Sequence, residues 1–175
     1  MPRWEHTVLL RVGIRPFEVY PSVSLTMSGL TPDSAHLPTR AVRILVADDH
    51  EVMRLGIRNL LESVADWSVY AEAKSGREAV DIALLSSPDI IIMDITMPEM
   101  NGLEAAARIA TERPHIPVIM FSLHLSEDVV GRFKTGTIRG AVAKSEAARD
   151  LLEAVRSVLA GGTFFPEKHS QAAAE

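Results

Sequence analysis

The chain of 175 residues contains no cysteine. This absence excludes a disulfide framework, a thiol nucleophile and any metal site built on thiolates. The chain also has no apolar run that approaches the roughly twenty residues of a membrane-spanning helix. Arginines interrupt the apolar residues near its start, which is unlike a signal peptide. We therefore expect a cytoplasmic protein that does not enter a membrane.

Basic residues are outnumbered by acidic ones, and the net charge is −5 at pH 7. Nucleic-acid binding usually needs a basic stripe that replaces the counterions of the phosphates, and the sequence has none. The chain also lacks the glycine-rich loops that hold nucleotide phosphates, and its six histidines are not spaced as metal ligands. We therefore expect no nucleic-acid partner for this chain alone.

The first forty residues differ from the rest. They hold five of the ten prolines and end in a linker-like composition, so we predict a disordered or loosely attached extension over residues 1–40, with Met27 as a candidate true start. From residue 41 onward, short apolar segments alternate with helical patterns, which is typical of βα units around a parallel sheet. The five predicted strands are Val42–Ala47, Ser68–Ala73, Ile90–Asp94, Val118–Ser122 and Gly140–Ala143.

Helix signals support the same organisation. Ser75 and Glu78 have the spacing of a capping box, in which each side chain bonds the backbone N–H of the other residue. The last helix should end at Gly161 and Gly162, since glycine adopts left-handed backbone without steric cost. Right-handed crossovers place helices on both faces of the sheet. The sequence thus predicts an α/β domain over residues 41–162 and a short tail over residues 163–175.

Acidic side chains follow two of the predicted strands. Asp48 and Asp49 come directly after the first strand, and Asp94 ends the third. The carboxyl ends of parallel strands meet at one edge, which is where open α/β sheets bind ligands. Three carboxylates close together repel one another unless a cation neutralises them, and Mg²⁺ prefers such oxygen ligands. We therefore predict Mg²⁺ at this edge.

Two more polar residues are predicted at the same edge. Ser122 closes the fourth strand and Lys144 follows the fifth. A hydroxyl can donate to one phosphoryl oxygen, and an ammonium offers positive charge to another. Each residue type alone is more often a turn or surface residue, so the argument depends on their joint placement. Together they indicate a phosphoryl-transfer centre with Asp94 as the nucleophile, because carboxylates form aspartyl-phosphates.

In this order and at these strand ends, the residues resemble the receiver domain of two-component response regulators. The matching residues are Asp48-Asp49, Asp94-Ile95-Thr96-Met97-Pro98, Asn101-Gly102, Ser122 and Lys144. The resemblance implies a flavodoxin-like, doubly wound (βα)5 parallel sheet with strand order 2-1-3-4-5. It also implies a signalling domain, not an enzyme with a separate substrate, which accepts a phosphoryl group on Asp94 from a sensor histidine kinase or phosphotransfer protein.

The resemblance further implies a role for each matched side chain. Mg²⁺ would be bound by Asp49, Asp94 and the backbone carbonyl of Thr96, and Asp48 would act through water. Ser122 and Lys144 would sense the new phosphoryl group.

The subtype follows from three shorter matches. The segments Phe121 to His124, Gly140 to Ser145 and Gly161 to Pro166 are similar to the LuxR/NarL type, which normally continues into a helix-turn-helix domain. Since Gln171 to Glu175 are too few residues for such a domain, we expect none within residues 1–175.

One position departs from the family pattern. Receivers usually carry Tyr or Phe three residues before the matched lysine, and this chain has Ala141. The resemblance implies a homodimer through the fourth helix, fifth strand and fifth helix. Without the aromatic, we expect phosphorylation to change self-association only weakly.

Three other interpretations stay open. The chain could be a truncated LuxR/NarL-type transcriptional regulator without its DNA-binding domain. It could be a pseudo-receiver that serves as an interaction module, which Ala141 favours and the intact acids oppose. A haloacid-dehalogenase-like phosphatase also uses an aspartate nucleophile with Mg²⁺, but its general acid would be a second Asp where this chain has Thr96.

Overall fold

The computed structural model describes residues 40–123, 125 and 136–165. The strands are β1 (Val42–Ala47), β2 (Trp67–Ala73), β3 (Ile90–Asp94), β4 (Val118–Ser122) and β5 (Ile138–Ala143). The helices are α1 (Glu51–Leu61), α2 (Gly76–Ser86), α3 (Gly102–Glu112) and α5 (Ala147–Leu159), and a short 3-10 helix, η1 (Lys144–Glu146), precedes α5. None of the helices in these residues is long and apolar enough to span a membrane.

The five strands form one parallel sheet in the order β2-β1-β3-β4-β5. The predicted flavodoxin-like fold and its strand order are therefore confirmed. Three strands have the predicted bounds, whereas β2 begins earlier, at Trp67, and β5 begins earlier, at Ile138. The added residues pair with the first residues of neighbouring strands, Trp67 with Val42 and Ile138 with Val118. The helix expected between β4 and β5 lies outside the described residues, as do His124 and residues 1–39 of the predicted extension.

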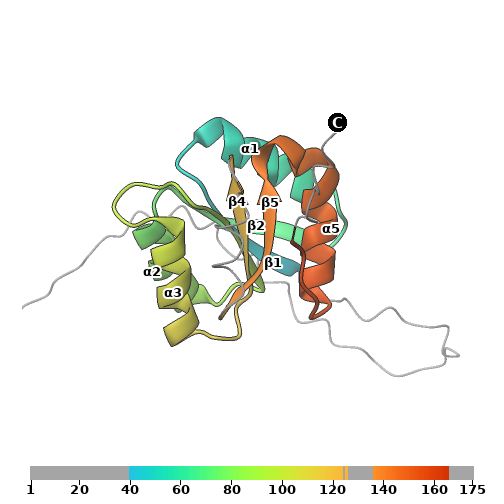
Figure 1. The fold of residues 1–175 in the computed structure, drawn as a ribbon. Coiled ribbons are helices and arrows are strands. Elements are labelled where there is room, and N and C mark those ends of the chain that lie inside the picture. Colours follow the sequence, from blue (N-terminus) through green and yellow to red (C-terminus); the bar gives the residue numbers. More distant parts are fainter. Residues whose placement is uncertain (1–39, 124, 126–135, 166–175) are drawn as a thin grey trace, which may run out of the picture.

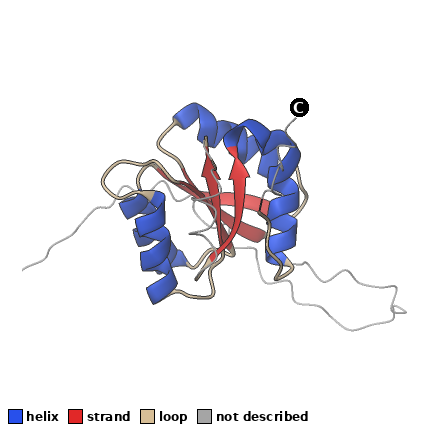
Figure 2. Ribbon diagram, in the orientation of Figure 1, coloured by secondary structure: helices blue, strands red, loops and turns tan. Residues whose placement is uncertain are grey.

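Helices cover both faces of the sheet. α2 and α3 lie on one face and α1 and α5 on the other (Figure 1), and Figure 2 shows the strands as the layer between them. Every residue of β3 and β4 is buried, as expected for central strands that are covered on both sides. One apolar layer packs Ile82 and Ile109 against the sheet, and the other packs Ile57 and Val155. This double cover fixes the strand ends that carry the acidic residues.

The chain turns back after α5 and rejoins the sheet. Gly161 has a φ of +86°, which glycine adopts without steric strain. Phe164 then forms a parallel bridge with Gly140, and the N–H of Ala141 donates to the carbonyl oxygen of Phe164 at 2.7 Å. Phe165 packs on the α2–α3 side of the sheet. The packed structure therefore continues past the boundary expected at Gly162.

Candidate functional site

The carboxyl edge of the sheet gathers the predicted polar residues. Asp48 and Asp49 follow β1, Asp94 ends β3, Ser122 ends β4, and Lys144 is the first residue after β5. Asp48, Asp94, Ser122 and Lys144 are buried, whereas Asp49 is exposed. Burying charged groups is costly unless they are paired, so their partners define the site.

Lys144 joins two of the acids. Its Nζ lies 2.7 Å from Oδ2 of Asp48 and 2.8 Å from Oδ2 of Asp94. Burial alone would lower the pKa of Lys144, but the hydrogen bonds to Asp48 and Asp94 outweigh it, so this pKa lies above its ordinary value. Lys144 therefore stays protonated and holds positive charge between two carboxylates.

Burial and several neighbouring groups act on the pKa of Asp94. Burial raises its pKa, and the neighbouring charge of Asp48 adds to this effect, whereas Lys144 and the N–H of Thr96 partly offset it. That N–H donates to Oδ1 of Asp94 at 3.3 Å, which leaves Oδ2 to Lys144. The pKa of Asp94 is raised as a result, although a cation partner is present.

The loop between β1 and α1 brings a fourth group to the acids. The N–H of His50 donates to Oδ1 of Asp48 at 2.9 Å, and its ring Nδ1 lies 2.7 Å from Oδ1 of Asp49. Ligand atoms of Asp48, Asp49, His50 and Asp94 all lie within 4.8 Å of one another. Three carboxylates in this space form a donor set that suits a hard cation such as Mg²⁺.

Ser122 and Ala141 flank the site on the β4 and β5 side. Ser122 pairs in register with Ala143, directly before Lys144. Ala141 is fully buried in the apolar layer on the α2–α3 side. The position where receivers usually carry a mobile aromatic is therefore occupied here by a small side chain inside the packed layer.

One buried ion near the site was missed from the sequence. Arg54 in α1 is buried, and its Nη1 donates to the backbone carbonyl of Asp48 at 2.8 Å. Arg54 lies three residues before Ile57 and seven before Leu61, so it shares the buried face of the helix with them. A charged residue on an apolar helical face is the signal that could have revealed it.

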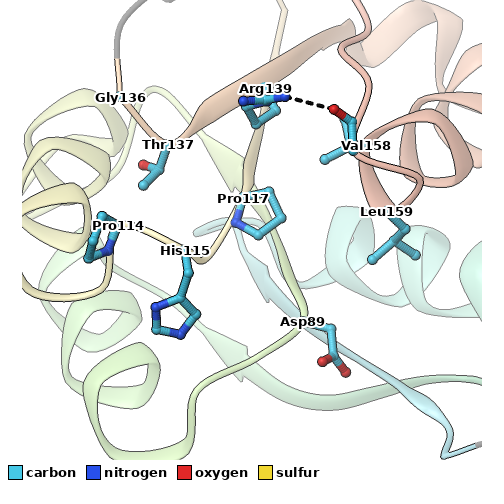
Figure 3. Close-up of a pocket in the computed structure, with 10 residues that line it drawn as sticks. Asp89, Pro114, His115, Pro117, Gly136, Thr137, Arg139, Val158 and Leu159 are labelled. Atoms are coloured by element: carbon cyan, nitrogen blue, oxygen red, sulfur yellow. Dashed lines mark hydrogen bonds between the residues drawn. The ribbon is translucent and has the colours of Figure 1, made fainter.

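A separate hollow of about 520 Å³ lies at the amino-terminal ends of β3, β4 and β5, away from the carboxyl edge (Figure 3). Its lining includes Asp89 before β3, Pro117 before β4 and Thr137 before β5. Arg139, also in the lining, donates to the carbonyl oxygen of Gly161 at 2.8 Å. None of the clustered acids contributes to this hollow, so it is not part of the candidate site.

The model of the response regulator receiver domain family matches residues 44–156. The chain belongs to this family. As a receiver, it is 32% identical over 124 residues to the response regulator protein VraR of Staphylococcus saprophyticus, an alignment that covers 71% of this chain and 59% of VraR. It is 31% identical over 130 residues to the response regulator UvrY of Escherichia coli K12, covering 74% of this chain and 60% of UvrY. The receiver thus spans about three-fifths of the length of these curated relatives.

Solved receivers have the same fold. A LuxR-family two-component response regulator from an Aurantimonas species is 32% identical, with a TM-score of 0.67, over 71% of this chain and 89% of that one. The response regulator domain of Thermotoga maritima CheB is also 32% identical, with a TM-score of 0.63, over 69% of this chain and 98% of that domain. The predicted resemblance to LuxR/NarL-type receivers is therefore confirmed.

Proposed function

We propose that this receiver accepts a phosphoryl group on Asp94 from a sensor histidine kinase or a phosphotransfer protein. The observation that carries the proposal is the buried carboxylate of Asp94 at the end of β3, with Nζ of Lys144 at 2.8 Å from Oδ2. A phosphorylated histidine is the donor. The P–N bond of the donor breaks, a bond forms between phosphorus and a carboxylate oxygen of Asp94, and the electron pair of the broken bond returns to the imidazole.

The surrounding residues stabilise the charge on the transferred group. Lys144 places an ammonium beside Asp94, and Ser122 ends the adjacent strand with a hydroxyl that donates to a phosphoryl oxygen. We assign Mg²⁺ to Asp49, Asp94 and the backbone carbonyl of Thr96, with Asp48 acting through water, because hard cations prefer these oxygen ligands. When bound, Mg²⁺ supplies further positive charge to the phosphoryl oxygens.

The remaining partner and location assignments belong to the same proposal. We place the protein in the cytoplasm and assign its self-association to the face formed by β5, α5 and the helix expected before them. Specific DNA binding by residues 1–175 alone is not expected, since the acidic balance leaves no basic stripe. An electrophoretic shift with the promoter of its own gene, at physiological salt, tests this expectation.

Phosphorylation with a small donor tests the proposal directly. Incubation with acetyl phosphate and Mg²⁺, followed by intact mass measurement, should show one added phosphoryl group per chain. Asp94→Asn should abolish the addition. The matched control is Asp81→Asn, because Asp81 is exposed on α2, and this variant should be modified like the original chain. Modification that persists in Asp94→Asn would overturn the assignment of the acceptor.

A further inference from the structure

We infer that Arg54 is a positioning residue that holds the Asp48-Asp49 segment in the geometry needed for cation binding, and so sets the metal affinity of the site. This inference rests on the proposed function, because it takes the acids at the carboxyl edge as the cation ligands. It concerns a residue that does not touch the cation itself.

The contacts of Arg54 reach from helix to strand end. Its Nη1 donates to the carbonyl oxygen of Asp48 at 2.8 Å, and its Nε donates to Oε2 of Glu72 at 3.1 Å. Only 5% of its side chain is exposed. A buried guanidinium with two fixed acceptors has little freedom to move. The Asp48 carbonyl, one residue past the end of β1, is therefore tied to α1 by a charged donor.

Glu72 holds the guanidinium group of Arg54 from the side of β2. Burial alone would raise its pKa, but hydrogen bonds from Arg58 and Arg54 outweigh it, so the pKa of Glu72 is lowered. Glu72 stays ionised at neutral pH and keeps both arginines in place. Because Glu72 lies on β2, the connection runs from β2 through α1 to the peptide that joins Asp48 and Asp49.

The position of that peptide matters for the acids on either side of it. The side chain of Asp48 bonds Lys144, and that of Asp49 lies beside His50. A shift of the Asp48 carbonyl would move both carboxylates relative to Asp94. Residues that orient metal ligands from outside the coordination shell typically change metal affinity by about 10- to 100-fold when replaced.

Arg58 provides a matched comparison within the same network. It also pairs with Glu72, and its Nη1 donates to the carbonyl oxygen of Val69 at 3.1 Å. Among the described residues, the hydrogen bonds and ion pairs of Arg58 also join α1 to β2, but none of them reaches Asp48. If Arg54 only attached α1 to β2, replacing either arginine would have the same effect on cation binding.

The test is a calorimetric titration of Mg²⁺ alone into the full chain and into Arg54→Met and Arg58→Met, at a temperature where circular dichroism shows all three folded. Arg54→Met should raise the Kd by about tenfold or more, whereas Arg58→Met should leave it unchanged. In phosphorylation by acetyl phosphate, Arg54→Met should need more Mg²⁺ for half-maximal rate but recover the original rate at saturating Mg²⁺. A structural role alone would not produce this split.

Each other outcome has a definite meaning. Arg54→Met that binds Mg²⁺ like the original chain, or Arg58→Met that loses as much affinity, would overturn the role of Arg54 and leave the proposed function intact. If the original chain binds no Mg²⁺, both fail. Should Arg54→Met not fold, Arg54→Lys replaces it. One ammonium cannot reproduce the planar two-acceptor contact, so a Kd unchanged in Arg54→Lys would also overturn the inference.

Discussion

Gly102→Ala tests whether the backbone of Asp94 is held by close packing against the start of α3. Gly102 is the first residue of α3, and its N–H donates to the carbonyl oxygen of Ile95 at 2.8 Å. A Cβ at this position would lie 1.9 Å from the carbonyl oxygen and 2.9 Å from the carbonyl carbon of Asp94. Both are backbone atoms, so no change of rotamer relieves the overlap. Either α3 or the end of β3 must move.

The size of the effect follows from this overlap. Extra atoms in a packed interior usually cost about 1 to 3 kcal/mol, and we expect the upper part of this range because the obstructing group is backbone. Gly56→Ala is the matched control, since a Cβ at Gly56 in α1 meets nothing within 4 Å. That substitution should stabilise the protein by up to about 1 kcal/mol, through the higher helix propensity of alanine.

Urea unfolding of both variants, followed by circular dichroism, measures the difference. We expect a lower midpoint for Gly102→Ala and an equal or higher midpoint for Gly56→Ala. Phosphorylation by acetyl phosphate should slow in Gly102→Ala, because the displaced backbone is that of the acceptor, and should be unchanged in Gly56→Ala. A Gly102→Ala protein as stable as the original chain would refute the reasoning, as would equal losses in both variants.

Further expectations concern three other residues. Lys144→Met leaves two buried carboxylates without their shared cation and should lower the free energy of unfolding by about 3 to 5 kcal/mol without metal; an unchanged urea midpoint would contradict this. The pKa of Glu72 is lower in the folded protein than in the unfolded chain, so its stabilising contribution is present above its unfolded pKa and is lost as the pH falls through its native pKa. In Glu72→Gln, the free energy of unfolding should therefore fall less steeply as the pH is lowered. An equally steep fall in both proteins would exclude this. Beryllofluoride should change sedimentation of the original chain only weakly, and full dimer formation unaffected by Ala141→Tyr would show that the missing aromatic has no role.

The sequence was sufficient for the strands and for the acids at their ends. Apolar runs such as Ile90–Asp94 carry a strong pattern, and parallel pairing brings their carboxyl ends together regardless of side-chain detail. The sequence did not predict which acids the ammonium group of Lys144 contacts. That Lys144 bonds Asp48 as well as Asp94 depends on the distance between β1 and β5 across the sheet, which no local pattern encodes.

The start of α2 shows that residue spacing predicts a helix cap only in part. At the start of α2, the hydroxyl of Ser75 accepts from the N–H of Glu78 as expected, but the carboxylate of Glu78 accepts from the N–H of Lys74. The complete capping box is formed instead by Asn101 and Glu104 at the start of α3. Spacing identifies which residues can cap, whereas the direction of the entering chain decides which amide each carboxylate meets.

The bridge between Phe164 and β5 has a consequence for how this domain can be cut from its chain. β5 is the last strand of the sheet, and an uncovered edge strand can pair with a strand of another molecule and start aggregation. The carbonyl oxygen of Phe164 accepts a hydrogen bond from the N–H of Ala141. The same oxygen would lie 2.9 Å from a Cβ added at Gly140, so the two segments are closely packed. A fragment that ends at Gly162 would lose the two backbone hydrogen bonds that Phe164 forms with β5, whereas one that ends after Phe165 would keep them. We therefore expect the stable boundary of the domain to be set by the segment that lies beside β5 in space, and not by the end of α5.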